Sequence, residues 1–496
     1  MRRTAPVRPV ETQDFASLQS DAPAPEYNPS VWQRLVEWLH KQKGYDPKRL
    51  TDPEPRAAIE ETRRILAKPL GDLAITQDIP EELTATLDQN IFFFSGFKTH
   101  HELEEASRML KGDDGNFKPF QQFLKDVETI NKVYNRNYLQ AEYNFATAST
   151  QMAVKWKEWE QEGDRYDLQY RTAGDSRVRE EHAALDGITL PPSDPFWDSY
   201  LPPNGWNCRC TAVQVRQGKY PRSDSAAAMA AGANCTDTPK KQIFRFNPGK
   251  QEKIFPPKHP YFPKGCGDCQ YKQLSYNADS PNCQACLALQ ADIKRREENR
   301  REYERLKKDP DYRDVEFDEA SGGVKATHVG HEVHSADKEE TFFKEQLTST
   351  QLEEKCQDVL YRLGNRAVLC NEKNKNPQTN IVDVALDLDL NGKRVDIASI
   401  TQQTTNIRNV LSGKNIQLKK FNHLDYVTEP ADAVCLYFHE PSMYDSSKIV
   451  DGIDKFKNIS YTDKETGERR HPTNYIRRVY CVINTDDGKL EIFDVE

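Results

Sequence analysis

The sequence predicts a multidomain protein with a mainly α-helical N-terminal half, a small zinc-ribbon-like connector and a C-terminal α+β domain with an antiparallel sheet. Its 496 residues are about three times the length of a typical domain. Apolar residues recur at helical spacing in the first part of the chain, and short strand-like runs gather after residue 328. Four cysteines in two C-x-x-C pairs lie between these regions.

The composition indicates several small or elongated modules. Hydrophobic residues make up 36% of the chain and charged residues 30%, which leaves much polar surface. The net charge of −9 argues against a general nucleic-acid coat, so any nucleic-acid site would be a local basic patch. No apolar run approaches the roughly 18 residues of a membrane span, and the first residues lack the apolar core of a secretory signal. With 11 cysteines and no such signal, reduced thiols and bound metal are favoured over disulfides.

A flexible arm is predicted over residues 1–29, and residues 30–162 are predicted to be mainly helical. Ser30 and Gln33 have the spacing of a capping box, and apolar residues follow at helical steps. A second helix is expected over residues 56–68 and a long one over residues 120–162. Between them, "IFFFSGFKTHHELEEASRML" (91–110) is predicted as a strand-like run, a glycine turn and a helix.

The most specific pattern is "YRTAGDSRVREEHAALDGITLPPSDPFWDSYLPPNGWNCRC", residues 170–210, in which glycines and proline pairs mark tight turns. His182, Cys208 and Cys210 are candidate ligands of one metal ion, because zinc accepts Cys and His. Asp186 or Asp198 is the predicted fourth ligand. C-x-C alone is a weak metal signal. The alternative is that His182 and Asp186 bond loop backbone groups while the cysteines pack as small hydrophobic side chains.

This pattern, with "FFFSGFKTHHELEEAS" and "YNRNYLQAEYNFATASTQMA" upstream, resembles the Mu F-like phage head morphogenesis family over residues 30–215. The resemblance implies a minor head protein of a tailed phage or prophage, with portal and capsid proteins as partners. It implies a role at the portal vertex in capsid assembly or DNA delivery, in the virion or in the host cytoplasm during assembly. It implies no catalytic role. The signature positions are Arg177, His182, Asp186, Gly187, Asp194, Trp197, Pro203, Asn207, Cys208, Arg209 and Cys210.

Residues 219–310 are predicted to connect this head domain (30–218) to a C-terminal domain over residues 325–496. Cys266, Cys269, Cys283 and Cys286 can present four thiolates to one structural Zn²⁺ ion. So short a segment cannot bury enough apolar surface without a metal. The alternatives are unmetallated thiols in a mobile connector, or disulfides. The charged helix over residues 291–309 is predicted to be a solvated spacer.

His328, His331 and His334 recur at three-residue steps, which on a helix would place them on one face where they could bind metal. The alternative is an exposed polar turn, because the neighbouring glycine and β-branched residues disfavour a helix.

The C-terminal domain is predicted from one helix followed by strand candidates. These are "RAVLC", "VDVALDL", "RVDIASI", "DAVCLYFH", "RRVYCVIN" and "KLEIFDV". Their order resembles the barnase–EndoU–colicin–RelE (BECR) type of ribonuclease. The resemblance implies metal-independent cleavage of RNA such as tRNA, in which the ribose 2′-OH attacks the adjacent phosphate. It also implies an immunity protein as a partner.

That reaction needs cations on the phosphate, a general acid and a general base. The candidates are Lys393 and Arg408 for the phosphate, Ser399, Thr401 and Thr405 for its oxygens, His423 or His439 for proton transfer, and Lys414, Arg477 and Arg478 for a basic groove. Ala398 departs from the family, because related toxins often have a lysine there. Loss of that cation would weaken or inactivate the enzyme.

The leading interpretation is a prophage minor head protein that carries a C-terminal nuclease-like domain, with toxin activity as one use for it. One alternative is a purely structural head protein whose C-terminal domain binds the portal or nucleic acid without catalysis. Another is a polymorphic toxin that uses the head-like region as a carrier.

Overall fold

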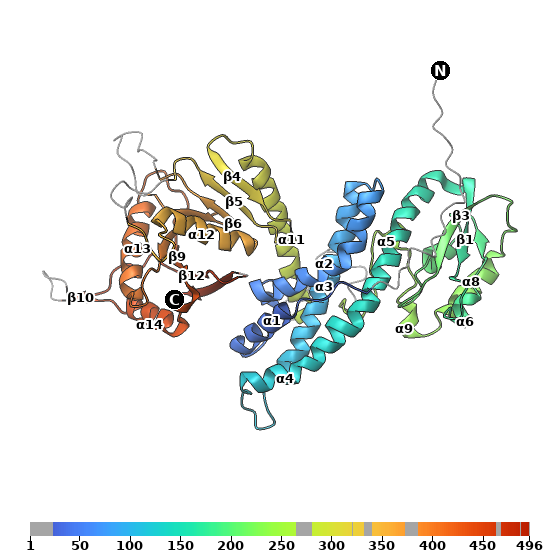
Figure 1. Cartoon of the computed structure of the whole chain (residues 1–496), viewed down its shortest axis with the longest axis horizontal. Coiled ribbons are helices and arrows are strands. Elements are labelled where there is room, and N and C mark those ends of the chain that lie inside the picture. The colour runs from blue at the N-terminus through green and yellow to red at the C-terminus, as the bar shows by residue number, and fades with distance from the viewer. Residues whose placement is uncertain are drawn as a thin grey trace, which may run out of the picture. The chain divides into compact units, whose positions relative to one another are not determined.

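The structure of the chain is a computed structural model that describes residues 23–263, 280–319, 321–331, 340–372, 385–462, 468–486 and 488–495. The chain divides into two compact units, Met1–Gln290 (unit 1) and Ala291–Glu496 (unit 2) (Figure 1). Each unit has its own hydrophobic core. Within the described residues, no helix is both long enough and apolar enough to cross a membrane.

Unit 1 begins with consecutive helices. They are α1 (Pro29–Gln42), α2 (Pro53–Thr76), α3 (Glu81–Arg108), α4 (Phe120–Asn131) and α5 (Leu139–Glu162), with a π-helical segment over Lys132–Tyr138 between the last two. Helix α1 starts at Pro29 and is capped by Asn28, whose side chain accepts a hydrogen bond from the Ser30 N–H at 3.0 Å. The predicted first helix is therefore confirmed, but its cap lies two residues before Ser30.

The prediction of a strand and a turn within residues 91–110 is wrong, because residues 81–108 form the continuous helix α3. Residues 91–94 and Phe97 are all buried, so this stretch of the helix is buried on every side. Such a run cannot be told from a buried strand by its periodicity. Gly96 serves close packing instead of a turn, since a Cβ at this position would lie 2.5 Å from Leu289 Cδ2.

Helix α3 also buries a carboxyl group, Glu102, which is 2% exposed. Burial raises the pKa of Glu102 to about 8, while nearby Lys98 opposes this rise and Glu142 adds to it. Glu102 is therefore protonated in the folded chain at neutral pH.

The raised pKa of Glu102 predicts how the stability of unit 1 depends on pH. The folded chain holds this proton more tightly than the unfolded chain, so the free energy of unfolding falls as the pH rises through the interval between the unfolded pKa and about 8. Relative to Glu102→Gln, the natural chain should lose up to about 1.4 kcal/mol per pH unit in that interval. Urea unfolding of both chains at several pH values measures this difference, and a difference that does not change with pH would contradict a buried neutral Glu102.

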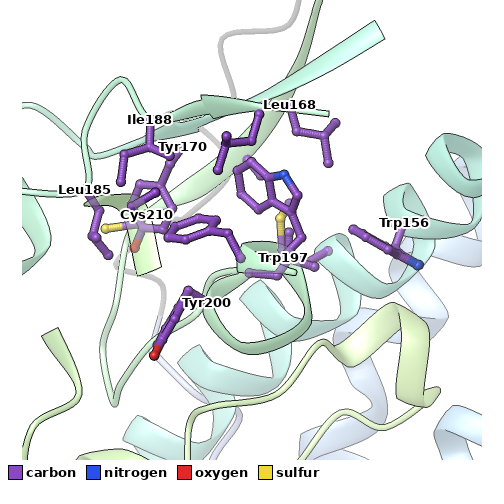
Figure 2. Close-up of a cluster of buried hydrophobic side chains, with 14 of the residues drawn as sticks. Trp156, Leu168, Tyr170, Leu185, Ile188, Trp197, Tyr200 and Cys210 are labelled. Carbon is purple, nitrogen blue, oxygen red and sulfur yellow. The ribbon is translucent and has the colours of Figure 1, made fainter. Parts of the chain in front are cut away.

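The rest of unit 1 is a small α+β module. Strands β2 (Thr189–Leu190), β1 (Tyr166–Arg171) and β3 (Thr211–Arg216) form an antiparallel sheet in that order. Helices α6 (Glu180–Ala183) and α7 (Phe196–Tyr200) lie between β1 and β3 in the chain, and α8 (Ser225–Cys235) follows. The core around Trp197 is drawn in Figure 2. Its buried members are Met152, Trp156, Trp159, Leu168, Tyr170, Leu185, Ile188, Leu190, Phe196, Trp197, Tyr200, Leu201, Cys208, Cys210, Ala212, Ala228 and Cys235.

Residues 219–262, predicted as the start of a connector, contribute to the core of unit 1. They contain α8 and the short helices α9 (Pro239–Gln242) and α10 (Pro248–Gln251). Phe255 stacks on Phe94 of α3 with ring centroids 3.6 Å apart. Gly249 lies so close to Trp156 of α5 that a Cβ there would be 2.2 Å from the Trp156 Cβ.

The predicted zinc ribbon falls only partly within the described residues. Cys266 and Cys269 lie outside them, and Cys283 and Cys286 lie in the first turns of α11 (Pro281–Leu306). The zinc ribbon stays a prediction.

Unit 2 is built on a mixed sheet that has eight strands within the described residues. The strands are β4 (Tyr312–Phe317), β5 (Val324–His328), β6 (Arg366–Leu369), β7 (Leu388–Leu390), β8 (Lys393–Ser399), β9 (Ala433–Phe438), β12 (Arg478–Ile483) and β13 (Lys489–Asp494). Their order in the sheet is β13-β12-β9-β8-β7-β6-β5-β4. A separate pair is formed by β10 (Tyr461–Thr462) and β11 (Arg469–Arg470).

The predicted antiparallel sheet is wrong for three of the strand pairs. Pairs β5–β6, β8–β9 and β9–β12 are parallel. Parallel neighbours need a crossover connection. Helices α12 (Ser349–Arg362), α13 (Ile407–Asn422) and α14 (Ser446–Lys457) supply one for each pair.

Helices cover both faces of this sheet (Figure 1). Helix α12 packs on one face, and α13 and α14 pack on the other. All residues of β9 are buried, and they alternate between the two cores: Ala433, Cys435 and Tyr437 face α12, while Val434, Leu436 and Phe438 face α13 and α14. An all-apolar strand is typical of such a covered sheet.

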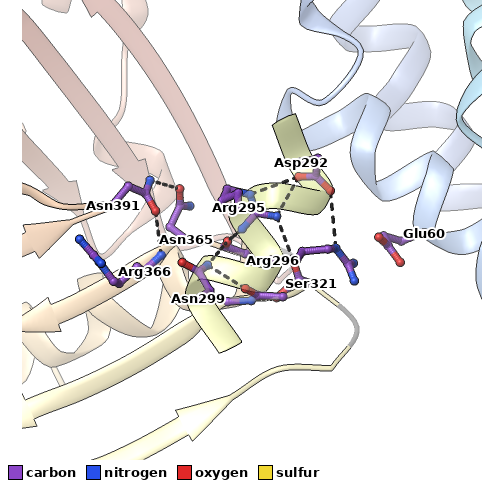
Figure 3. A network of polar contacts seen from close by, with 12 residues as sticks. Glu60, Asp292, Arg295, Arg296, Asn299, Ser321, Asn365, Arg366 and Asn391 are labelled. Carbon is purple, nitrogen blue, oxygen red and sulfur yellow. Dashed lines mark hydrogen bonds and ion pairs between the residues drawn. The ribbon is translucent and has the colours of Figure 1, made fainter. Parts of the chain in front are cut away.

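The charged helix α11 is docked in unit 2 and is not the solvated spacer that its charges predicted. Asp292 and Asn299 are only 5% and 4% exposed. The Asn299 side-chain amide donates to Gly322 O at 2.8 Å, and the Arg295 side chain donates to Gly364 O (Figure 3). These bonds satisfy carbonyl groups in the turns before β5 and β6, and Leu306 of the helix packs in one cluster with Val324 of β5 and Val368 of β6.

Candidate functional site

One imidazole and three thiols meet in the α+β module of unit 1, and we call these four residues the Cys–His centre. His182 lies in α6, Cys208 and Cys210 precede β3, and Cys235 ends α8. The Sγ atoms of Cys208 and Cys210 each lie 3.5 Å from His182 Nδ1, and Cys235 also acts to raise the pKa of this imidazole. All four side chains are buried. The structure thus brings the predicted triplet of His182, Cys208 and Cys210 together.

Two local features position the imidazole. Gly187 has a φ of 80° and donates its N–H to Tyr170 O at 2.9 Å, which turns the chain back from α6 so that β2 pairs with β1. Glycine adopts this left-handed conformation at low cost. Arg179 Nη1 lies 3.1 Å from His182 Nε2, and Arg179 Nη2 donates to Trp206 O. Arg179 therefore ties α6 to the C-x-C loop.

The electrostatics of the Cys–His centre favour one thiolate. The hydrogen bond from Cys210 lowers the pKa of the Cys208 thiol well below its usual range, although burial opposes this. The same contact raises the pKa of Cys210. Burial lowers the pKa of His182, but hydrogen bonds to Cys208 and Cys235 outweigh it and raise this pKa to about 9. A metal ion could take the place of the imidazolium proton, because thiolate and neutral imidazole are preferred zinc ligands.

The structure corrects the predicted fourth ligand. The Asp186 carboxylate accepts hydrogen bonds from the N–H and hydroxyl of Thr172 at 2.7 and 3.0 Å. The Asp198 carboxylate pairs with Lys250 at 2.7 Å. Both predicted aspartates are thus engaged elsewhere.

Other signature residues hold loops of the same module together. Arg209 forms two hydrogen bonds to the Asp175 carboxylate, at 2.6 and 2.5 Å, which is the strong bidentate arrangement. Asp194 accepts from the Phe196 N–H at 2.9 Å at the start of α7. Trp197 is fully buried in the core. Asp194 also accepts from the Ser225 hydroxyl at 3.1 Å, which joins α7 to α8. These contacts are structural, since they hold the loops and the core of one fold together.

The residues predicted for metal-independent RNA cleavage lie apart in unit 2. Lys393 and Ser399 are at opposite ends of β8, which separates them by about 20 Å of extended chain. Arg408 is near the start of α13 and His423 follows its last residue, which separates them by about 22 Å. Thr401 follows the end of β8. One scissile phosphate could not contact both ends of either element.

The predicted histidine face is not helical. His328 ends strand β5, and its Nδ1 accepts from the Gly330 N–H at 2.8 Å. His331 is buried, with 2% of the residue exposed, and His334 lies outside the described residues. Of the two described histidines, His331 is the one that lies among other possible metal ligands.

Four carboxylates, one lysine and one histidine gather at the edge of β8 and α12, and we call them the acidic cluster: His331, Glu353, Glu372, Asp387, Asp396 and Lys414. His331 Nε2 lies 3.1 Å from Glu353 Oε2, and His331 Nδ1 lies 3.3 Å from Glu372 Oε1. Lys414 Nζ donates to Asp396 Oδ1 at 3.0 Å. This cluster was not predicted as a site.

Two of these carboxylates face each other across a hairpin. Strands β7 and β8 pair antiparallel, with Leu388 opposite Val395. The next pair away from the turn is therefore Asp387 opposite Asp396. Asp387 Oδ2 also accepts from the Ile397 N–H at 2.7 Å. Like charges directly opposite each other destabilise a sheet. This arrangement therefore needs a compensating positive charge.

Lys414 of α13 supplies part of that charge. It reaches Asp396 on β8 from the neighbouring helix. Burial lowers the pKa of Lys414, but Asp396 and Asp387 outweigh this effect and raise it. Lys414 is therefore charged at neutral pH.

One lysine does not neutralise the whole acidic cluster. Burial and the charge of Asp387 raise the pKa of Asp396, while Lys414 opposes this rise. Burial raises the pKa of Glu372 to about 8; His331 opposes the rise, and Asp387 and Glu353 add to it. Burial likewise raises the pKa of Glu353. The cluster therefore carries an excess of acidic groups that is costly to ionise.

The sequence contains a hairpin signal that places Asp387 opposite Asp396. Asn391 and Gly392 have φ of 53° and 87° and form the two-residue turn between β7 and β8. Asn-Gly between apolar runs is a strong hairpin signal. Asp387 and Asp396 are equally far from this turn, so the hairpin pattern alone would have paired them.

Residues 115–213 match the protein family described as "Phage Mu protein F like protein". The putative capsid assembly protein F of Escherichia phage Mu is 39% identical over 69 residues, which cover 14% of this chain and 16% of that protein. The Mu-like prophage FluMu F protein of Haemophilus influenzae is 40% identical over 67 residues, which cover 12% of this chain and 16% of that protein. No solved structure matches the chain.

The family match covers about one fifth of the chain, and the matches to the two relatives cover about one sixth of those proteins' length. The family match includes His182, Cys208 and Cys210, whereas Cys235 and all of unit 2 lie beyond it. Unit 1 therefore contains a Phage Mu protein F-like region.

Proposed function

We propose that the chain is a phage head protein that acts in capsid assembly at the portal vertex, with portal and capsid proteins as partners. The observation that carries this proposal is the match of residues 115–213 to the Mu F-like family, together with a relative that is a putative capsid assembly protein. The architecture of the region fits a structural component of the head, because its signature residues join loops around a buried core. On this proposal the chain is found in the virion, or in the host cytoplasm during assembly.

The test is whether the chain is part of the particle. Heads purified from cells that produce the phage should contain peptides from both units by mass spectrometry, in few copies relative to the major capsid protein. Heads that form normally and lack the chain would contradict the proposal. That result would favour a toxin that uses the head-like region only as a carrier.

We further propose a structural zinc ion in the Cys–His centre, with His182, Cys208, Cys210 and Cys235 as its ligands. The support is one imidazole nitrogen with two sulfurs at 3.5 Å and a third thiol beside it. A site with four protein ligands has no open position for substrate. The ion would hold α6, α8 and the C-x-C loop together and would not catalyse a reaction.

Zinc analysis of the purified chain tests this site. Cys208→Ser should lower the zinc content by about one ion per chain, because it removes one of four ligands. The matched control is Cys481→Ser, which changes a buried cysteine of unit 2 that lies in an apolar core. Cys283→Ser separately reports on the predicted ribbon. An unchanged zinc content in Cys208→Ser would remove the ion from the Cys–His centre.

A second candidate function is cleavage of nucleic acid, RNA above all, by unit 2. It is favoured by the buried Lys414–Asp396 pair beside Asp387, since a cation among carboxylates suits phosphoryl transfer. An immunity protein would then be a further partner. Incubating the full chain with RNA tests it. Intact RNA under all conditions would favour the alternative that unit 2 only binds a partner.

A further inference from the structure

The acidic cluster contains a buried carboxylate oxygen that has no hydrogen-bond donor. Asp396 is 2% exposed, and Lys414 bonds to its Oδ1 at 3.0 Å. In the part of the chain that the structure describes, Asp396 Oδ2 accepts no hydrogen bond, and the group beside this carboxyl is the carboxyl of Asp387. Buried carboxylate oxygens are almost always hydrogen bonded or bound to a cation, so this one points to a ligand.

The neighbours of Asp396 are ligands of the kind that a divalent ion would use. The donor atoms of His331, Glu353 and Glu372 all lie within 4.8 Å of one another. Asp387 lies opposite Asp396 in the hairpin of β7 and β8, and its Oδ2 accepts from the Ile397 N–H at 2.7 Å. The groups that face one another here are four carboxylates from α12, β8 and the segments around β6 and β7, against the imidazole of His331 and the ammonium of Lys414.

Carboxylate oxygens are the ligands preferred by Mg²⁺ and Mn²⁺, whereas thiolates select softer metals. We propose that unit 2 binds a hard divalent cation, Mg²⁺ or Mn²⁺, through carboxylates of the acidic cluster, with Glu353, Asp387 and Asp396 as ligands, and uses it to hydrolyse nucleic-acid phosphodiesters. The choice of substrate rests on the nucleic-acid function proposed for unit 2. The cation site itself does not depend on it.

The cationic surface of α13 supports a phosphodiester as the substrate. This helix carries Arg408, Lys414, Lys419 and Lys420 and no acidic residue. In a chain with a net charge of −9, such a helix is a local positive feature. Polyanions are attracted to such patches. Lys414 links this helix to the carboxylates, so a bound phosphate and a bound cation would be adjacent.

The reaction is a hydrolysis that balances without any further reagent. The oxygen of a water molecule forms a bond to phosphorus and gives its proton to a carboxylate of the cluster. The bond between phosphorus and the leaving ribose oxygen breaks, and that oxygen keeps the electron pair and takes a proton from a second water. The hydroxide that remains takes back the proton held by the carboxylate, so one water is consumed in all. The cation and Lys414 stabilise the negative charge that develops on the phosphate oxygens. The products are a phosphate monoester and an alcohol, and no 2′-OH is needed.

Manganese binding to the full-length chain tests the cation site directly. The chain is freed of metal and titrated with MnCl₂, and free Mn²⁺ is followed by its electron paramagnetic resonance signal. Glu353→Gln and Asp396→Asn should each weaken binding by roughly tenfold or more. The matched control is Glu354→Gln, because Glu354 follows Glu353 in α12 but pairs with Arg313 at 3.3 Å. It should bind like the natural chain.

Two results would overturn the cation site: no Mn²⁺ binding by the natural chain at millimolar concentration, or equal binding by all four chains. Glu353 is 18% exposed, so its glutamine variant should fold even if Asp396→Asn does not. A thermal melt of each variant checks this.

Cleavage is scored separately on supercoiled DNA and on RNA, with Mg²⁺ or with EDTA. Hydrolysis of both substrates in Mg²⁺, abolished by EDTA and by Glu353→Gln, supports the whole proposal. Binding of Mn²⁺ without cleavage keeps the cation site and rejects the nucleic-acid function of unit 2. Cleavage of RNA alone that persists in EDTA and in Glu353→Gln overturns the role of the cation and keeps a metal-independent ribonuclease.

Discussion

Replacing Trp197 by alanine is expected to lower the free energy of unfolding of unit 1 by about 3–5 kcal/mol. The indole is fully buried at the centre of the core that joins the sheet to α5, α7 and α8 (Figure 2). It packs edge to face against Phe196 with ring centroids 4.9 Å apart. Neighbours held by the sheet cannot collapse into the space left behind, so the loss includes both the transfer of the side chain and the cavity.

Urea unfolding followed by circular dichroism measures this loss. The control is Ile75→Ala in α2, whose side chain is 83% exposed and should change the unfolding free energy by less than about 0.5 kcal/mol. If both variants unfold at the same urea concentration as the natural chain, Trp197 is not the centre of the core described above.

Replacing Lys98 by methionine is expected to cost about 3–5 kcal/mol, because it leaves a buried charge without its partner. Lys98 Nζ lies 2.6 Å from Glu142 Oε2 and donates to Tyr134 O at 2.8 Å. The two side chains are 0% and 4% exposed. Tyr134 lies in the π-helical segment. One ammonium group therefore satisfies both a carboxylate on α5 and a main-chain carbonyl of the irregular segment that precedes it.

A double-mutant cycle separates this pair from general packing. Lys98→Met combined with Glu142→Gln should recover part of the stability lost in Lys98→Met alone, because the uncompensated carboxylate is gone. Strictly additive losses in the double variant would show that the two side chains do not interact. The measurement is the urea midpoint of all four chains at neutral pH.

Helices and strands whose apolar residues recur with a clear period could be predicted from the sequence, and those without such a period could not. Helix α1 has both a cap and amphipathic spacing, and it was predicted almost to its first residue. Helix α3 was misread because residues 91–94 are buried on all sides, so the helical period disappears. Strand β9 was found as an apolar run, but its parallel pairing depends on helices that lie elsewhere in the chain.

In the candidate sites, residues that share a local sequence pattern could be predicted, and residues from distant segments could not. His182, Cys208 and Cys210 could be grouped because they share one short signature, whereas Cys235 comes 25 residues after Cys210 on a helix of alanines and gave no local signal. In the acidic cluster, Asp387 and Asp396 could have been paired through the hairpin turn. Glu353 and Lys414 could not, because they reach the sheet from two separate helices.

The central claim is that head assembly belongs to unit 1 and is separable from the acidic cluster of unit 2. Counting DNA-filled heads by electron microscopy, in cells whose own copy of the gene is deleted and replaced by a variant, tests it most directly. Glu353→Gln should restore as many filled heads as the natural chain, and Trp197→Ala should restore few. Equal failure of both variants, or normal heads without any copy of the gene, would contradict the claim.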